Sequence, residues 1–352
     1  MGDQLQLTAA EPEVFLYEGG HIPEELRRSL TRVRVGPQVT EIPDGAFHYC
    51  EKLIELQLNE GLQVIGSHAF RGCTALRSVI LPSSVTGLRW EAFSDCSGVI
   101  DLQLNEGLRL ISNGAFQNCN ALRSVTIPST ITELRGGAFY RCSNLSEVIF
   151  LDGKRLLNQE FFSRGLQRDD QGLLQGLINR EAIEEMLIYE YYYGGEREFI
   201  FEYCPLTTVN ISISWAVSER MASLPRAFRL TVEERIHILR RLELQQDGNV
   251  LVRFPVVRGD GDDYVFEEDT YDVRDTNHET ARSLYRVLQL IAFYELKESS
   301  IAIELAMWKS RIDKATFVRR TDCRVAVPDP AKSLIMEYGG FAGFLEPVIE
   351  GA

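Results

Sequence analysis

The chain has 352 residues, of which 45% are hydrophobic, so it can bury the core of one large domain or of two ordinary ones. Its formal net charge of -14 argues against nucleic acid or an anionic membrane as the main partner, because both require a basic protein surface. Residues 1–12 lack the basic and apolar segments of a secretory signal, and no later run approaches the eighteen or so apolar residues of a membrane span, so we expect a cytoplasmic protein without a membrane span.

The first predicted elements precede a repeat array. Residues 14–17 are predicted as a strand, followed by a Gly19-Gly20 turn, a short helix from Pro23 and a second strand at 33–35. An array of stacked repeats needs a cap over its terminal apolar surface. We therefore assign residues 1–38 to an N-terminal cap.

Residues 39–150 contain one phrase written five times with a period of 23 residues. Its mark is Ala-Phe followed by Cys three residues after the Phe. A fixed period in the twenties is typical of a solenoid, in which each turn buries its apolar side against its neighbours. The phenylalanines are Phe47, Phe70, Phe93, Phe116 and Phe139, and the cysteines are Cys50, Cys73, Cys96, Cys119 and Cys142.

A second pattern, apolar-x-x-apolar-x-apolar, begins three residues after each of these cysteines. Its last part alternates as a half-buried strand does, so Leu56 and Leu58 are predicted to point inward while Glu55, Gln57 and Asn59 point outward. Stacking the repeats then gives a parallel strand ladder. The outward positions predicted for this ladder are Glu55, Gln57, Ile80, Asp101, Gln103, Thr126, Glu147 and Ile149.

The spelling PSSVTGLRWEAFSDC at 82–96, with PSTITELRGGAFYRC at 128–142, resembles the BspA-type leucine-rich repeat. With its non-repeat C-terminal half, the chain looks most like intracellular diatom or algal members of that family. The resemblance implies an α/β leucine-rich-repeat solenoid with a parallel strand ladder, followed by a mainly helical α+β C-terminal region. It predicts the fold far better than the function.

Seven cysteines leave a choice between disulfides, a metal site and buried thiols. A constant spacing of 23 fits neither a secreted disulfide framework nor paired zinc ligands, which favours small buried thiols. Cys204 is assigned to the same column, and Cys323 carries no catalytic signal. We expect no metal and no cofactor.

The array continues past residue 150 in less regular form. Leu157 and Phe161-Phe162 occupy repeat positions, which predicts a sixth repeat in which Gly165 replaces the Cys. The F-x-x-C spacing returns at Phe201 and Cys204, followed by the strand residues Leu206, Val209 and Ile211. We assign 39–213 to the solenoid, with a helical insertion near 166–197 in which the tyrosines 189 and 191–193 are expected to pack against the solenoid.

Residues 214–352 are assigned to a mixed, mainly helical C-terminal domain. The capping box Thr231-x-x-Glu234 predicts a helix start, 247–249 a turn, and 250–257 a strand with Pro255 marking its edge. Residues 258–279 are predicted as a solvated acidic loop. The alternative of a calcium loop at Asp260, Asp262 and Asp263 lacks the third carboxylate and the glycine that such a loop requires. Residues 276–315 are predicted as two helices broken near 299–300, and the tail as a strand and a short helix.

The C-terminal half contains no motif of a phosphate loop, zincin helix, nucleophile elbow or dinucleotide-binding site. His237 and His278 are expected to be surface or packing residues. We therefore expect no catalytic residues and a non-catalytic scaffold whose strand ladder binds another protein. The acids Glu55, Asp101 and Glu147 favour a partner with a basic surface. Two alternatives stay open, namely an enzyme with an unfamiliar C-terminal site and a surface adhesion protein, as in bacterial relatives.

Overall fold

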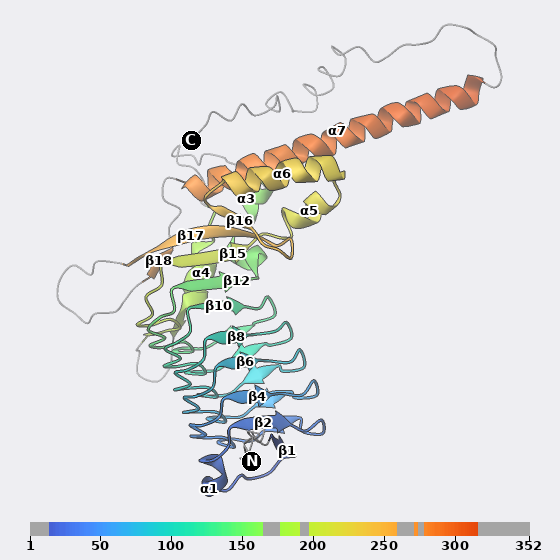
Figure 1. The fold of residues 1–352 in the computed structure, drawn as a ribbon. Helices are drawn as coiled ribbons and strands as arrows, with labels where there is room; N and C mark the ends of the chain where they lie inside the picture. The colour runs from blue at the N-terminus through green and yellow to red at the C-terminus, as the bar shows by residue number, and fades with distance from the viewer. Residues whose placement is uncertain (1–13, 165–176, 191–196, 259–270, 274–277, 316–352) are drawn as a thin grey trace, which may run out of the picture. The chain divides into compact units, whose positions relative to one another are not determined.

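The computed structural model describes residues 14–164, 177–190, 197–258, 271–273 and 278–315 (Figure 1). The chain divides into two compact units, which are described separately. Unit 1 is Met1–Asn158, Gly176–Ser212 and Arg253–Asp275, and unit 2 is Gln159–Gln175, Ile213–Val252 and Thr276–Ala352.

Unit 1 begins with the elements predicted for the cap. Strand β1 (Phe15–Tyr17), helix α1 (Glu24–Arg27) and strand β2 (Arg32–Val35) occur where the sequence places them. Strand β1 pairs in parallel with β2, and β2 pairs in parallel with the first repeat strand, so the cap is continuous with the ladder. The Tyr17 ring meets the Phe47 ring edge-on, with centroids 4.9 Å apart, and so covers the first ring of the repeat core.

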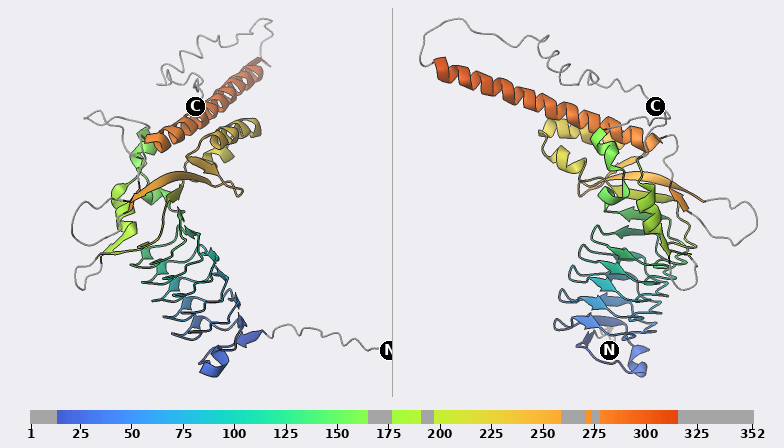
Figure 2. Two further views of the ribbon diagram at one scale, coloured as in Figure 1. Left: turned by 60° about the vertical axis from the view of Figure 1, so that its left-hand side comes forward. Right: turned by 180° about the vertical axis from the view of Figure 1, so that it is seen from behind.

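The predicted parallel ladder is present, and the turns that carry it stack along unit 1 (Figures 1 and 2). Paired strands of successive repeats are in register at a 23-residue offset, as in Ser78↔Asp101 and Val125↔Val148. Its strands after β2 are β4 (Glu55–Gln57), β6 (Ser78–Ile80), β8 (Asp101–Gln103), β10 (Ser124–Ile127), β12 (Glu147–Phe150) and β15 (Thr208–Ser212).

Each turn also contributes a two-residue strand to a second parallel ladder, which the sequence analysis did not predict. The order along this five-stranded sheet is β11-β9-β7-β5-β3, so adjacent strands come from consecutive repeats. The strands are β3 (Glu41–Ile42), β5 (Val64–Ile65), β7 (Gly87–Leu88), β9 (Leu110–Ile111) and β11 (Glu133–Leu134).

The phenylalanines form a column of stacked rings through the core. Centroid separations between neighbouring rings run from 5.0 to 5.6 Å, and the ring planes differ by 13° or less. The Phe backbone also links the turns, since the Phe70 N–H donates to the Ala92 carbonyl at 2.8 Å. The column contains Phe47, Phe70, Phe93, Phe116, Phe139 and Phe201, and every one of these rings is buried.

Between β12 and β15 the chain leaves the repeat path. It forms α2 (Gly153–Leu156), α3 (Gln159–Arg164), α4 (Arg180–Leu187) and the antiparallel strands β13 (Ile188–Glu190) and β14 (Arg197–Phe199). The predicted helical insertion is therefore part helix and part strand pair. The sixth repeat does not join the core column, because Phe201 stacks on Phe139 at 5.3 Å while Phe161 and Phe162 lie in α3. Leu157 forms an antiparallel bridge to Ile178 instead of extending the second ladder.

The predicted return of the repeat at Phe201 is confirmed. Strand β15 pairs in parallel with β12, with Val148 opposite Val209 and Phe150 opposite Ile211. Strand β17 (Val250–Arg258) contains the predicted strand 250–257, and its last residues pair antiparallel with β18 (Tyr271–Val273), which lies within the predicted acidic loop. In the sheet order, β17 lies between β15 and β16 (Leu242–Leu244). Pro255 does not mark an edge strand, because the next residue, Val256, donates to the Thr207 carbonyl and also pairs with Val273 of β18.

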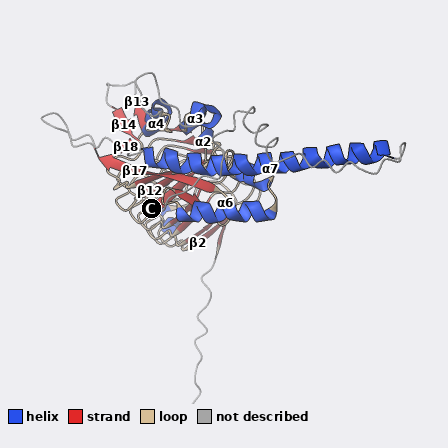
Figure 3. Cartoon of the chain, turned by 90° about the horizontal axis from the view of Figure 1, so that it is seen from above, coloured by secondary structure: helices blue, strands red, loops and turns tan. Residues whose placement is uncertain are grey.

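Unit 2 contains α5 (Ser218–Ala222), α6 (Arg226–Ile238) and α7 (Glu279–Ala315), and Figure 3 shows α6 and α7 side by side. The Phe228 and Tyr294 rings stack between these two helices with centroids 4.4 Å apart. The predicted turn at 247–249 is confirmed, with Gly248 at φ +86°.

Two helix boundaries in unit 2 were predicted wrongly. Helix α6 begins at Arg226 after Pro225, and Thr231 lies inside it with its hydroxyl donating to the Ala227 carbonyl at 3.2 Å. Helix α7 runs without a break through Ser299 and Ser300, whose hydroxyls donate to the Glu295 and Lys297 carbonyls of the same helix.

Several predictions lie outside the described residues. These are the calcium-loop alternative at Asp260, Asp262 and Asp263, the tyrosines 191–193, Cys323, and the strand and short helix of the tail.

Candidate functional site

The predicted ladder face exists as a surface on the strands of the first ladder. Gln57, Ile80, Asp101 and Gln103 are exposed, whereas Glu55, Thr126, Glu147 and Ile149 are half-buried. The residues between them point the other way, and Val79, Leu102, Val125 and Val148 are buried. Leu56 and Leu58 are only half-buried, and Asn59 turns back to donate to the carbonyls of Gly36 and Val39 at 2.9 Å.

At its N-terminal end, the ladder face already satisfies its own charges. The Arg32 guanidinium lies 3.3 Å from the Glu55 carboxylate on the neighbouring strand. Arg34 donates to the Gln57 side-chain carbonyl at 2.8 Å, and Gln57 donates to Glu55 at 2.6 Å. A cationic partner at this end would have to compete with two arginines of the same face.

Further along, the other two acids have neutral partners. Asp101 accepts from the Ser78 hydroxyl at 3.1 Å and from the Gln103 amide at 3.3 Å, and Glu147 accepts from the Asn210 amide. Amide and hydroxyl donors leave the negative charge in place. The acidic character predicted for the face is therefore strongest around Asp101 and Glu147.

Exposed apolar side chains adjoin these acids. Ile80 on the face is 52% exposed, and Ile54 and Ile100, which immediately precede β4 and β8, are 55% and 62% exposed. Ile54 and Ile100 were not predicted because the alternating part of the strand pattern begins one residue after each of them. An apolar contact beside acids is the arrangement of a protein-binding surface more than of a catalytic site.

The cysteine column is buried, as predicted. Each thiol from Cys73 onward donates to the carbonyl of the Phe one turn earlier in the stack, as Cys96 does to Phe70 at 3.1 Å and Cys204 to Phe139 at 3.0 Å. Burial raises the pKa of the Cys96 and Cys119 thiols, which keeps them protonated and unreactive. Six cysteines are free and buried among the described residues.

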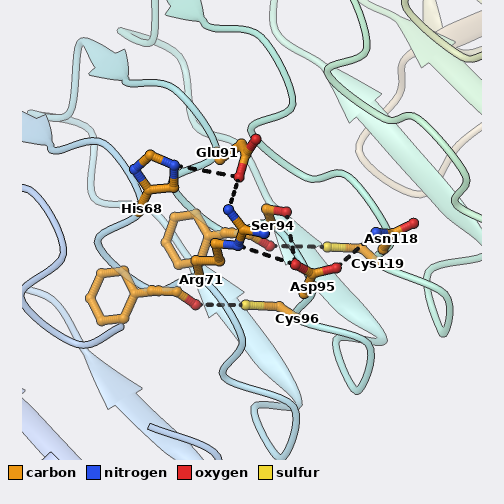
Figure 4. A network of polar contacts seen from close by, with 10 residues as sticks. His68, Arg71, Glu91, Ser94, Asp95, Cys96, Asn118 and Cys119 are labelled. Atoms are coloured by element: carbon orange, nitrogen blue, oxygen red, sulfur yellow. Dashed lines mark hydrogen bonds and ion pairs between the residues drawn. The ribbon is translucent and has the colours of Figure 1, made fainter. Parts of the chain in front are cut away.

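A polar network missed by the sequence analysis lies on the turns that carry the Ala-Phe mark (Figure 4). Arg71 lies between two carboxylates, 2.6 Å from Glu91 and 3.3 Å from Asp95. His68 is 3.5 Å from Glu91, and Asn118 donates to Asp95 at 2.7 Å. These residues come from three consecutive repeats. His68 and Glu91 share one repeat position, and Asp95 and Asn118 share another, but the residue type at each position changes from turn to turn, so no repeated motif marks the network.

Aromatic rings adjoin the network. His48 stacks on Tyr49 with centroids 4.2 Å apart, and His68 meets the Trp90 ring edge-on at 4.6 Å. Burial, together with the positive charge of Arg71, lowers the pKa of His48, so this imidazole is neutral at pH 7. An unusual concentration of aromatic residues on exposed turns is the one sequence signal that could have indicated this region.

Within the described residues, no group of three or more His, Cys, Asp or Glu side chains could hold a metal ion. None of the described helices is long and apolar enough to cross a membrane.

Comparison with protein families decides the nature of the repeats. A model described as the BspA type leucine rich repeat region matches six copies over residues 40–166. Residues 40–166 are thus similar to BspA-type leucine-rich repeats, in agreement with the resemblance seen in the sequence. The match reaches residue 166, so the predicted sixth repeat is retained in sequence even though its phenylalanines lie outside the ring column.

Solved structures similar to the repeat region come from bacteria. A leucine-rich repeat protein of T. pallidum is 30% identical, with a TM-score of 0.34 over 35% of this chain and 59% of that one. A leucine-rich cell surface protein of Faecalibacterium prausnitzii is 22% identical, with a TM-score of 0.29 over 42% and 46% of the two chains. A leucine-rich repeat protein of Bacteroides ovatus is 19% identical, with a TM-score of 0.25 over 40% and 58%.

This chain thus spans between 46% and 59% of the length of those bacterial proteins. No curated protein sequence matches it. The resemblance to diatom and algal members stays a prediction.

Proposed function

We propose that unit 1 is a non-catalytic scaffold that binds another protein through the ladder face. The observation that carries the proposal is the ladder face itself. Its outward side chains contribute little to the core, yet Ile80 is exposed on β6, which pairs with the β8 strand that carries Asp101. Ile54 and Ile100 are exposed at the residues that immediately precede β4 and β8. Protein-binding surfaces combine such an apolar centre with a polar rim.

The partner is proposed to be a protein that brings both apolar and basic side chains. The basic side chains would meet Asp101 and Glu147, whose own partners are neutral, more readily than Glu55, which Arg32 already faces. Attraction between exposed charges weakens with salt, so binding should be weaker at high ionic strength. A cytoplasmic location is part of the same proposal, and a fluorescent tag on the full-length protein would test it.

The proposal is tested by using the purified full-length protein to capture partners and then comparing two sets of variants. Ile80→Ser with Ile100→Ser removes the apolar centre, and Asp101→Asn with Glu147→Gln removes the charges without placing new ones beside the arginines. We expect both sets to lose the captured partner and to retain the melting temperature of the unchanged protein.

The matched control is Glu133→Gln, which removes an exposed acid from β11 on the second ladder. It should leave the captured partner bound. A partner retained by both sets of ladder variants would contradict the proposed face, and loss through the isoleucine variants alone would remove the basic partner from the proposal.

A further inference from the structure

Four aromatic rings form a continuous line across three turns of unit 1. Tyr49 contacts His48 at 4.2 Å, His48 lies 6.2 Å from His68, and His68 contacts Trp90 at 4.6 Å. The two end rings face solvent, with Tyr49 51% and Trp90 52% exposed. We call these four residues the aromatic edge.

The turns do not require these rings. The positions equivalent to Trp90 in the other repeats hold Asp44, Ser67, Asn113 and Gly136, all of which are small or polar. Tyr49 adopts φ +57°, a backbone conformation that a bulky side chain rarely takes, where the next repeat has Gly72. A Cβ built on Gly72 would lie 2.3 Å from the Tyr49 ring, so the ring rests over the backbone of the following turn.

Two large exposed rings on one surface are suited to binding a partner. Trp and Tyr are the residues most enriched among the energetic centres of protein interfaces. A bulky residue held in a rarely populated backbone conformation points to a functional role.

The charge around the aromatic edge indicates what it binds. Over residues 41–50, 64–73 and 87–96 there are four acids and two arginines. Both arginines are already engaged, Arg71 with Glu91 at 2.6 Å and Arg89 with Glu41 at 3.1 Å. The Asp44 side chain is 64% exposed and lies 3.9 Å from Arg89, and a third arginine, Arg27, donates to the Gly45 carbonyl at 3.4 Å. Four carboxylates therefore lie near three arginines, which leaves a small excess of negative charge beside the rings.

We propose that the aromatic edge is a second interaction surface, which binds a protein segment bearing Arg or Lys side chains over Trp90 and Tyr49. A cation is attracted to the face of an aromatic ring, most strongly to Trp, and the nearby carboxylates add to that attraction. This surface is distinct from the ladder face and stands whether or not the ladder binds a partner.

The test uses the full-length protein and a fluorescein-labelled peptide of alternating Arg and Gly residues, followed by fluorescence anisotropy. A second peptide with citrulline in place of Arg keeps the shape and removes the charge. We expect the Arg peptide to bind, the citrulline peptide to bind at least about tenfold more weakly, and Trp90→Ala with Tyr49→Gly to lower the affinity for the Arg peptide by about tenfold.

Two further variants separate this site from general attraction to an acidic protein. Ile238→Ser removes an exposed apolar side chain from α6, outside both proposed surfaces, and should leave peptide binding unchanged. Asp44→Asn leaves the rings in place and should lower the affinity for the Arg peptide severalfold.

Equal binding by the Trp90→Ala, Tyr49→Gly variant would overturn the proposal, as would equal binding of the citrulline peptide. Loss of binding in the ladder-face variant Ile80→Ser, Ile100→Ser, with no loss in the edge variant, would assign the peptide to the ladder face instead. Thermal melting of each variant shows whether it is folded. If the Trp90→Ala, Tyr49→Gly variant is unfolded, the Asp44→Asn variant and the citrulline peptide test the proposal in its place.

Discussion

The residue before each repeat cysteine shows how turn geometry acts on individual side chains. In every turn this residue has a positive φ, between 56° and 74°, whether it is Gly72, Asp95, Asn118, Arg141 or Tyr203. Gly, Asn and Asp tolerate this region, whereas other residues pay about 1 kcal/mol or more for it. The residues that precede the repeat cysteines therefore form a column in which different residue types can be compared in one backbone conformation.

Exchanging residue types within this column should change stability in opposite directions. Arg141→Asn relieves the backbone cost but loses the guanidinium contacts with Tyr140 at 5.0 Å and Tyr203 at 5.4 Å, so we expect a net gain of about 0.5 kcal/mol at most. Asn118→Arg adds the backbone cost and loses the 2.7 Å hydrogen bond to Asp95, for a loss of about 2 kcal/mol. Urea unfolding measures both, and a loss from Arg141→Asn as large as that from Asn118→Arg would contradict this account.

The buried thiols give a second prediction at this scale. On a Cys323→Ser background, a thiol reagent should label none of the other six cysteines in the native protein and all six after denaturation, because every one of them is buried. Cys96→Ala should lower the free energy of unfolding by about 1 kcal/mol through a small cavity. Rapid native labelling of all six would show that the column is open to solvent.

Residue identities in the core were predictable, and those of the polar network were not. The Phe and Cys columns follow from a period of 23 alone, because every turn repeats the same contact. The contacts of Arg71 with Glu91 and Asp95 depend on how far each turn is displaced from the last and on side-chain rotamers. Neither the displacement between turns nor the rotamers can be predicted from the repeat sequence.

At the scale of elements, prediction failed where the wider fold overrode a local signal. Residues 152–165 keep the repeat spelling, but the later segment around Phe201 takes the next place on the ring column. The thiol of Cys204 is 65 positions from the Phe carbonyl that it meets, whereas Cys142 is 26 positions from its own. Similarly, the capping box predicted a helix start at Thr231, but α6 begins after Pro225 and is about a turn and a half longer at its N-terminus than predicted.

The assignment of Phe201 to the column is open to a direct test. Phe201→Ala should remove the last ring of the stack and cost about 3 to 5 kcal/mol, with hydrogen exchange increasing over 139–150 and 206–212. Phe161→Ala, which also removes a fully buried ring, should instead increase exchange within α3 and its surroundings in unit 2. If Phe161→Ala increases hydrogen exchange over 139–150 and Phe201→Ala does not, then the ring of the sixth repeat, and not Phe201, stabilises the end of the ring column.

Across the whole of unit 1, stability should be distributed along the stack. Each ring of the column contacts the ring before it and the ring after it, as Phe47 does with Tyr17 at 4.9 Å and Phe70 at 5.0 Å. In such an array, the free energy is approximately a sum of nearest-neighbour contributions. Damage at an end should stay local, and damage in the middle should divide the array into two shorter and weaker parts.

Phe47→Ala and Phe116→Ala remove the same ring from the end and from the middle of this column, and both rings are buried. Phe47→Ala should increase hydrogen exchange over 15–57 while 92–150 stays protected, because the later turns keep all of their own contacts. Phe116→Ala should lower the urea midpoint further and increase exchange on both sides of residue 116, since neither fragment retains enough neighbours. Uniform loss of protection over 15–150 in both variants would mean that unit 1 unfolds as a single cooperative block, and the nearest-neighbour description would then be wrong.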